Sequence, residues 1–443
     1  MLGGRDDRIA LVDAATGERI TYGALRARVA ERAVALRPAA GPAGIGVAFA
    51  GNDVATIVEL YAALATGVPI ALLDRQLDDR RARAWIERYR PEVVTGRAFG
   101  GPLPRGGAAP HRDLALLLST SGTLGSPRMV RLAGAAVEAN ARAIAEALAI
   151  GPDEIAVTSL PLAYAYGLSI VTSHLAAGAT VVVTAESVVS ERFWRACRDH
   201  GVTSLAGVPY TYEMLRRVEL TRVAPPTLRT LTQAGGALAP AQIRHFHAIA
   251  AARGGGLIVM YGQTEATARI SVLPASELPA RAGAVGRAIP GGAIAIAPDG
   301  GEIVFRGPSV MMGYAGGRDD LARGDELGGE LWTGDRGVLD RDGLLWITGR
   351  SRRIAKVFGQ RIDLDELEAI TRALAGTSAV AAIARGDRVR VFVEAGSAAT
   401  AIDTRALAEA TGLHGRGFEL VELPVLPRLA SGKLDYQALA EAP

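Results

Sequence analysis

A loop rich in hydroxyl side chains follows the apolar run Leu114–Ser119 and has the composition of an anion-binding site. It reads Thr120-Ser121-Gly122-Thr123-Leu124-Gly125-Ser126-Pro127-Arg128. Four hydroxyls, two glycines and a terminal arginine could surround a triphosphate with O–H, backbone N–H and guanidinium donors. The loop lacks the G-x-x-x-x-G-K-[ST] spacing of a Walker loop. Taken alone, it could equally be an ordinary turn at the end of a strand.

Lysine is nearly absent from this chain. Among its 49 lysine and arginine residues, the lysines are Lys356 and Lys433 alone. Lysine is a compact ammonium on a flexible stem, whereas arginine is a planar fork. A crowded reacting group that needs one point charge can therefore require lysine. On composition alone, the alternative is that these two lysines remain by chance and have no special function.

Several short polar motifs accompany the loop and the lysines. They are Tyr261-Gly262-Gln263-Thr264-Glu265, Thr333-Gly334-Asp335, Gly349-Arg350 and Pro427-Arg428-Leu429-Ala430-Ser431-Gly432-Lys433. With these motifs the chain resembles the adenylate-forming superfamily, which comprises acyl-CoA synthetases, nonribosomal peptide synthetase adenylation domains and firefly luciferase. Further segments agree in order with that family: Pro161–Gly167, Val285–Gly291, Gly301–Val304 and Gly313-Tyr314.

The resemblance implies binding of ATP and Mg²⁺. It assigns ATP contacts to Thr120, Ser121, Gly122, Thr123, Gly125, Arg128, Gly235, Gly236, Ala237, Tyr261, Gly262, Asp335 and Arg350. Tyr261 and the Gly235–Ala237 turn would flank the adenine, while Asp335 and Arg350 would bind the ribose. Thr264 would hydrogen-bond the α-phosphate. Glu265 would ligate Mg²⁺, a hard cation suited to one carboxylate plus phosphate oxygens and water.

The same resemblance divides the catalytic work between the two lysines. Lys433 would contact the substrate carboxylate and the bridging α-phosphate oxygen, stabilising charge during in-line attack. Lys356 would face the active site in a second half-reaction, after the small domain rotates about a hinge at Arg352. Gly359 would line the entry of a pantetheine thiol, where a side chain would obstruct the arm.

The predicted acid pocket is defined less sharply. Its candidate residues are Tyr164, Tyr166, Val208, Ala234, Gln263 and Ile270, each of which could equally be core packing. Amino-acid-activating members carry an aspartate just after this segment, but here the stretch is Tyr166-Gly167-Leu168-Ser169-Ile170. The sequence therefore favours an apolar acyl or aryl acid. Leu124 and Arg128 replace the hydroxyl and the lysine usual in the family's phosphate loop.

An alternation of short apolar runs and helical patterns over about the first 270 residues predicts mainly parallel sheets covered by helices. The predicted strands are Gly44–Phe49, Ile70–Leu73, Leu114–Ser119, Ala156–Leu160, Val181–Thr184, Ser204–Gly207 and Leu257–Tyr261. The predicted helices are Asp53–Thr66, Ala136–Leu148 and Ala239–Ala252. From Gly283 to Gly349, turns rich in Gly, Pro and Asp indicate an antiparallel β-rich subdomain.

The last part of the chain has a different pattern. An N-cap at Asp363 and a glycine at Gly376 bound a predicted helix. A hairpin over Ala379–Glu394 and a helix at Thr404–Thr411 follow. We therefore predict an α/β protein of two domains: residues 1–350 bind ATP and the acid, and residues 351–443 form a small, hinged α+β catalytic domain.

Composition excludes several other classes of protein. The formal net charge is +3 and no basic block contains interleaved aromatic residues, which argues against nucleic-acid binding. The lone cysteine, Cys197, excludes a disulfide framework. The N-terminus lacks an apolar signal core, and polar residues interrupt the apolar region Leu160–Val183, which predicts a buried helix plus strand. We expect a cytoplasmic protein that does not bind membranes.

Together these patterns predict an ATP-dependent acid–thiol ligase. A carboxylic acid would be converted to acyl-AMP with release of pyrophosphate, and a pantetheine thiol of CoA or of an acyl or peptidyl carrier protein would displace AMP. Two alternatives remain open: an adenylating enzyme with an amine or another non-thiol acceptor, and a degenerate nucleotide-binding protein without turnover.

Overall fold

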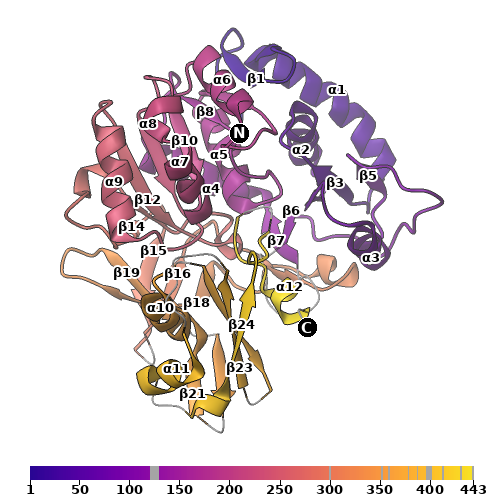
Figure 1. The fold of residues 1–443 in the computed structure, drawn as a ribbon. Helices are drawn as coiled ribbons and strands as arrows, with labels where there is room; N and C mark the ends of the chain where they lie inside the picture. The colour runs from indigo at the N-terminus through magenta and orange to yellow at the C-terminus, as the bar shows by residue number, and fades with distance from the viewer. Residues whose placement is uncertain are drawn as a thin grey trace.

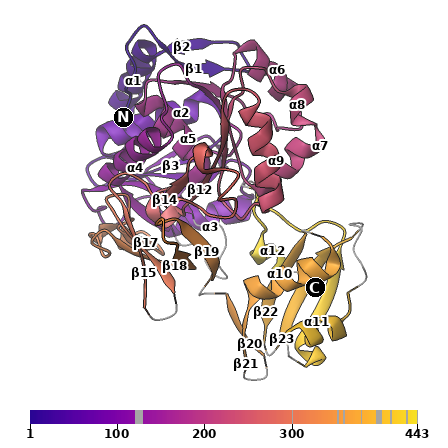
Figure 2. The same ribbon diagram turned by 90° about the vertical axis from the view of Figure 1, so that its left-hand side faces the viewer.

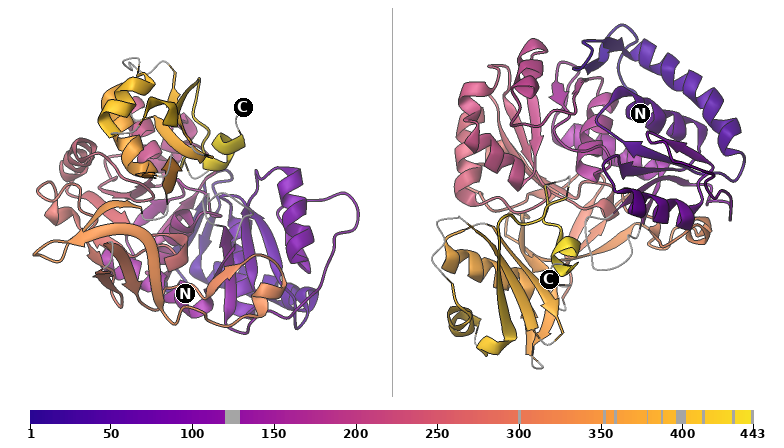
Figure 3. Two further views of the ribbon diagram at one scale, coloured as in Figure 1. Left: turned by 90° about the horizontal axis from the view of Figure 1, so that it is seen from below. Right: turned by 45° about the vertical axis from the view of Figure 1, so that its right-hand side comes forward.

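The computed structural model describes residues 1–119, 129–298, 301–350, 353–357, 360–377, 379–386, 388–395, 402–411, 414–429 and 432–441. A large body carries most of the chain, and a smaller lobe with α10, α11 and β22 to β24 lies below it in Figure 1. In both views of Figure 3 the yellow C-terminal segment lies between this lobe and the large body.

A six-stranded sheet forms one half of the large body. Its strands, in spatial order, are β17 (Gly313–Ala315), β7 (Met129–Ala133), β6 (Leu114–Ser119), β4 (Ile70–Asp74), β3 (Gly46–Ala50) and β5 (Val93–Thr95). Strands β6, β4, β3 and β5 are parallel, whereas β7 runs antiparallel to β6. Ser119 pairs with Met129, so the two ends of the predicted phosphate loop are adjacent. The helices of this half are α1 (Tyr22–Ala40), α2 (Val54–Thr66) and α3 (Asp79–Tyr89).

A nine-stranded sheet forms the other half. Its strands are β14 (Arg287–Ala288), β13 (Ser271–Leu273), β12 (Gly256–Tyr261), β11 (Thr230–Gln233), β10 (Ser204–Gly207), β8 (Ile155–Val157), β9 (Thr180–Val183), β1 (Ile9–Asp13) and β2 (Arg19–Thr21). The run from β12 to β1 is parallel. Its helices are α5 (Ala165–Ala176), α6 (Glu191–Asp199), α7 (Pro209–Arg217), α8 (Leu220–Val223) and α9 (Pro240–Ala251), while α4 (Gly134–Ala147) packs between α5 and strands β6 and β7 of the six-stranded sheet. Figure 2 shows α7 to α9 on the opposite side of the body from α1 and α2.

The β-rich subdomain is antiparallel throughout. It consists of β15 (Ala293–Ile296), β16 (Glu302–Arg306), β18 (Glu330–Leu339) and β19 (Leu345–Arg350). Short 3₁₀ turns at η1 (Thr264–Ala266), η2 (Ala275–Glu277) and η3 (Asp319–Ala322) connect neighbouring segments. The antiparallel arrangement confirms the prediction made from the turn-rich sequence.

The small lobe has its own packed interior. Its elements are β20 (Ile354–Val357), β21 (Gln360–Asp363), α10 (Leu364–Ala375), β22 (Val380–Arg385), β23 (Arg388–Glu394), α11 (Thr404–Thr411), η4 (Gly415–Gly417), β24 (Phe418–Leu423) and α12 (Tyr436–Glu441). Two hydrophobic clusters draw all their described members from residues 355 to 439. The domain boundary at residue 350 stays a prediction.

The predicted fold class is confirmed, with local differences in element bounds. The strand predicted at Ala156–Leu160 ends at Val157, because the chain turns away before Pro161. The apolar region Leu160–Val183 folds as α5 followed by β9, the predicted helix plus strand. Within the described residues, no helix combines the length and apolar character needed to cross a bilayer.

Candidate active site

The parallel strands of the nine-stranded sheet direct several predicted site residues to one edge. Tyr164 follows β8, Val208 follows β10, Gly235 follows β11 and Thr264 follows β12. Ligands of open α/β sheets bind at the carboxyl ends of parallel strands. The topology therefore brings the acid-pocket, adenine and α-phosphate candidates to the same region.

Lys433 reaches this edge from the small lobe. Its Nζ lies 5.2 Å from the centroid of the Tyr164 ring, within cation–π distance. Gly235 lies beside both residues, and its φ of 80° is in the left-handed region that favours glycine. A Cβ at position 235 would lie 2.6 Å from Tyr164 Oη and 3.6 Å from Lys433 Cε. Only glycine therefore permits this approach of lysine and tyrosine.

Contacts within and around its loop hold Lys433 in position. Leu429 N donates to Lys433 O over 2.8 Å, and Gly432 N donates to Leu429 O over 2.8 Å. The Arg428 guanidinium lies 4.8 Å from the Tyr210 ring centroid and donates to Gly432 O over 3.2 Å. The loop is thus tied to α7 of the large body through Tyr210.

Two predicted nucleotide residues are in direct contact. The Tyr261 hydroxyl donates to Asp335 Oδ2 over 2.6 Å, and only 4% of Asp335 is exposed. Asp335 lies opposite Arg350 in the register of β18 and β19. The adenine and ribose candidates therefore adjoin one another, although they come from different sheets.

The predicted magnesium ligand is held by a tyrosine from the other half of the body. The Tyr314 hydroxyl, on β17, donates to Glu265 Oε1 over 2.7 Å. Thr267, just beyond, has a φ of 65°, a strained conformation for a β-branched residue and one that concentrates at functional sites. Within the described part of the chain, no three His, Cys, Asp or Glu side chains converge on one metal position. A single carboxylate such as Glu265 fits Mg²⁺, which usually takes its other ligands from phosphate oxygens and water.

The predicted acid-pocket residues are mostly buried. Tyr166, Val208, Ala234 and Ile270 are each at most 3% exposed. The Tyr166 hydroxyl bonds to Thr232 O over 3.0 Å. Burial raises the pKa of the Tyr164 and Tyr166 phenols to about 12, so both are neutral near pH 7.

Comparison with known proteins identifies the family. The model of the AMP-binding enzyme family matches residues 98–315. A sulfoacetate–CoA ligase from Cupriavidus necator is 32% identical over 364 residues, which cover 78% of this chain and 69% of that protein. The chain belongs to the AMP-binding enzyme family.

Other relatives of this AMP-binding enzyme agree. Phenyloxazoline synthase MbtB from a Mycobacterium species is 29% identical over 95% of this chain, which spans only 39% of that protein. The solved o-succinylbenzoate CoA synthetase from Bacillus subtilis, in complex with its acyl-adenylate intermediate, has a TM-score of 0.76 at 22% identity. The match covers 98% of this chain and 96% of that one, and supports the fold. The predicted enzyme class, an AMP-forming acid–thiol ligase, is confirmed by the family and its CoA-ligase members.

Some predicted site residues of the AMP-binding enzyme lie outside the described residues: Thr120, Ser121, Gly122, Thr123, Gly125, Arg128, Arg352 and Gly359. The backbone of Lys356 lies in β20, where it pairs with Arg361. Gly236 and Ala237 are exposed beside Gly235, and Gly262 directly follows β12.

Two contacts at the candidate site were not predicted from the sequence. The pairing of Tyr314 with Glu265 joins positions 49 residues apart, which no local pattern indicates. The other contact is that of Arg269, which is 1% exposed with its guanidinium 4.6 Å from the Tyr166 ring centroid. Its only sequence signal was an arginine directly before the apolar run Ile270–Leu273, in a chain where arginine is common.

Proposed function

We propose that this enzyme activates a small carboxylic acid as its acyl-AMP and transfers the acyl group to the thiol of CoA. The approach of Lys433 to Tyr164 and Gly235, at the edge where the parallel strands end, carries this proposal. A flexible cation from one lobe meets the predicted acid pocket of the other at this point. Since ATP and CoA are cytoplasmic metabolites, we propose the cytoplasm as the compartment.

In the first step, a carboxylate oxygen of the acid attacks the α-phosphorus of ATP. The bond from that phosphorus to the bridging oxygen breaks, and pyrophosphate leaves with the bond's electron pair. Lys433 would stabilise the negative charge on the attacking and bridging oxygens, which is the main requirement of phosphoryl-type transfer. Thr264 would hydrogen-bond the α-phosphate.

Tyr261, Asp335 and Arg350 would orient the nucleotide. The Asp335 carboxylate has oxygens to accept both ribose hydroxyls, and Arg350 can donate to the same sugar. Glu265 would hold Mg²⁺, which neutralises charge on the phosphates when it is bound. The 120–128 loop would supply the remaining phosphate donors.

In the second step, the thiol sulfur attacks the acyl carbonyl carbon. The carbon–oxygen bond to AMP breaks, AMP leaves, and the thiol proton passes to solvent. We propose that the small lobe first turns about Arg352, so that Lys356 replaces Lys433 at the site and Gly359 lines the thiol path. A carrier-protein thiol is the alternative acceptor, suggested by the likeness to the synthase MbtB.

The test is acid-dependent exchange of pyrophosphate into ATP. The acids would include sulfoacetate, indoleacetate and ferulate, taken from the names of relatives, together with fatty and amino acids. Lys433→Ala should abolish exchange, because a lost charge-assisted contact in the transition state costs about 100-fold or more. Lys356→Ala should retain exchange and slow thioester formation.

Equal loss of exchange in both lysine variants would refute the division of roles. If the wild-type enzyme binds ATP but catalyses no pyrophosphate exchange with any of the acids, the chain is a nucleotide-binding protein without turnover. AMP release measured with CoA, a carrier protein and simple amines distinguishes a thiol from a non-thiol acceptor.

A further inference from the structure

Arg269 is a buried cation with unused hydrogen-bonding capacity. It is 1% exposed, and its Nη2 lies 3.3 Å from Ser169 Oγ. Its Nε is buried and, among the described residues, has no hydrogen-bond partner. The backbone is fixed, because Asn140 Nδ2 donates to Arg269 O over 3.1 Å.

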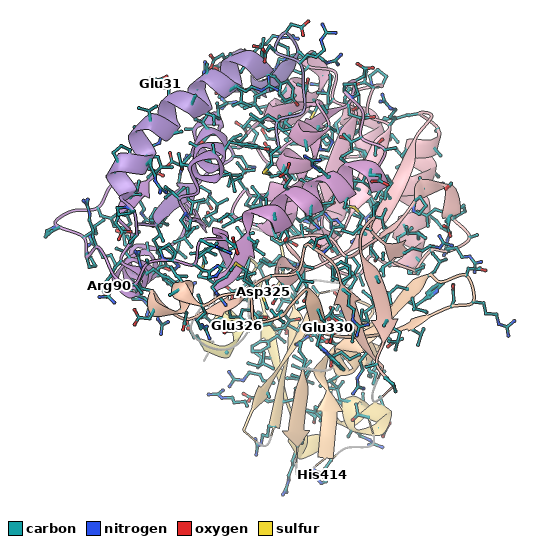
Figure 4. The ribbon with its side chains drawn as sticks, turned by 180° about the vertical axis from the view of Figure 1, so that it is seen from behind. Glu31, Arg90, Asp325, Glu326, Glu330 and His414 are labelled. Atoms are coloured by element: carbon teal, nitrogen blue, oxygen red, sulfur yellow. The ribbon has the colours of Figure 1, made fainter. Side chains whose placement is uncertain are left out.

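The other fully buried arginines of the large body differ from Arg269 in one respect. Arg131 pairs with Glu326 over 2.6 Å, and Arg318 pairs with Glu92 over 3.0 Å. Figure 4 shows Glu326 beside Asp325, on the segment leading to β18. Within the described ranges, Arg269 forms no ion pair with any carboxylate.

An unpaired buried charge is costly, so this exception requires a reason. Burial lowers the pKa of Arg269, yet a guanidinium stays protonated at neutral pH. Removing a cation from water without an opposite charge carries a large free-energy cost even after relaxation. The Tyr166 ring face and one serine hydroxyl offset only part of that cost.

Arg269 also adjoins the proposed acid pocket. Lys433 Nζ contacts the Tyr164 ring, the Tyr164 and Tyr166 rings pack edge-on with centroids 6.3 Å apart, and Tyr166 contacts Arg269. The lysine and the arginine thus lie at opposite ends of one series of contacts. A second buried donor, Gln263 Nε2, has no partner among the described residues either.

We propose that Arg269 binds a second anionic group of the acid substrate, so that the substrate is a dianion whose other carboxylate is adenylated near Lys433. This inference rests on the proposed function and replaces the expectation of a purely apolar acid. An anion at Arg269 would accept a hydrogen bond from the Nε–H that has no partner among the described residues.

The test compares symmetrical diacids with their own monomethyl esters. Malonate, succinate, adipate and benzene-1,4-dicarboxylate each keep one reactive carboxylate when the other is esterified. We expect the wild-type enzyme to prefer at least one diacid over its ester in kcat/KM for exchange. The preference should be about 10- to 100-fold, the range of a hydrogen bond to a charged group.

Two variants assign that preference to the arginine. Arg269→Met should bring the diacid-to-ester ratio close to one, and Arg269→Lys should restore part of it. The diacid-to-ester ratio is measured within one preparation of each variant. A misfolded, inactive fraction lowers both rates equally and leaves the ratio unchanged. A wild-type enzyme that uses esters as well as diacids would overturn the inference while leaving the ligase function intact.

A binding measurement separates the inference from the proposed function. The shift in Tm on adding each diacid or ester is measured with Mg²⁺ and ATP present. If exchange is absent but a diacid raises the Tm of the wild-type protein and not of Arg269→Met, the anion site stands and the ligase proposal fails. If no diacid exceeds its ester in exchange or in Tm, Arg269 has a structural role only.

Discussion

At the residue scale, two tyrosine hydroxyls orient the two carboxylates proposed to bind the metal and the ribose. Tyr314 donates to Glu265, and Tyr261 donates to Asp335. Each hydroxyl bonds to one oxygen of its carboxylate and so fixes the direction in which that carboxylate faces. The two pairs are chemically alike but would serve different ligands, so each is a control for the other.

Tyr314→Phe should therefore raise the Mg²⁺ concentration needed for half-maximal exchange. A hydrogen bond to a charged group contributes about 1.5 to 3 kcal/mol, and water will replace part of it, so we expect a change of about five- to tenfold. Tyr261→Phe should raise the KM for ATP and leave the Mg²⁺ dependence unaltered. Identical effects of both substitutions on both ligands would contradict this assignment.

These pairs mark how far the sequence could predict the site. Glu265, Asp335 and Lys433 stand in compact motifs whose residue types alone carry the chemistry. Tyr261 and Tyr314 stand in such motifs too, but their pairing with Asp335 and Glu265 was not predictable, because each hydroxyl reaches its carboxylate from a different sheet. The sequence could not predict that Arg269 has no ion-pair partner among the described residues, since pairing depends on which carboxylates the fold brings near.

At the element scale, Arg353 joins the start of β20 to three other elements of the small lobe. Its guanidinium pairs with Asp365 and, over 2.8 Å, with Glu368, both on α10. It donates to Ala382 O on β22 over 2.7 Å and lies 4.2 Å from the ring centroid of Tyr436 on α12. Tyr436 is three residues from Lys433, so this arginine connects the start of β20 to the segment that carries Lys433.

Arg353→Leu should strongly destabilise the small lobe. The substitution leaves the buried Glu368 paired with the more exposed Arg372 alone among the described basic side chains, and breaking a buried ion pair costs about 3 to 5 kcal/mol. The matched control is Arg372→Leu, which removes a second, more exposed partner of the same Glu368. That change should cost at most about 1 kcal/mol. Urea unfolding measures the free energy of unfolding of both variants. Similar decreases in the two would contradict a special stabilising role of Arg353.

Elements were predictable where local pattern and tertiary context agree. The strands Leu114–Ser119 and Ser204–Gly207, and the helix Thr404–Thr411, have the predicted bounds. No strand was assigned to Ile9–Asp13, whose parallel partner β9 lies more than 160 residues further along the chain. Such a short strand is specified by its distant neighbour as much as by its own residues.

At the scale of the whole molecule, the Lys433 loop fixes the small lobe in one pose. Gly432 packs against Val208 and Tyr210, and Arg428 stacks on Tyr210. This pose suits the first half-reaction, because it brings Lys433 to the proposed acid pocket. The proposed second half-reaction requires Lys433 to withdraw so that Lys356 can approach.

A disulfide between the two parts should separate the half-reactions. A Cβ at Gly432 would lie 3.3 Å from Tyr210 Cβ, close to the 3.5–4.5 Å typical of disulfides. When oxidised, the double variant Gly432→Cys/Tyr210→Cys should retain pyrophosphate exchange and lose thioester formation, and a reductant should restore the latter. Cys197 will not interfere, because it is 1% exposed and burial raises its pKa to about 12.

The single variants control for the substitutions themselves. Gly432 has a φ of 80°, so a cysteine there introduces backbone strain of about 1 kcal/mol. Tyr210→Cys also removes the stacking of Arg428. Neither single variant should respond to oxidant. If the oxidised double variant forms thioester as fast as the reduced one, a single pose serves both steps, and Lys356 has no separate role to play.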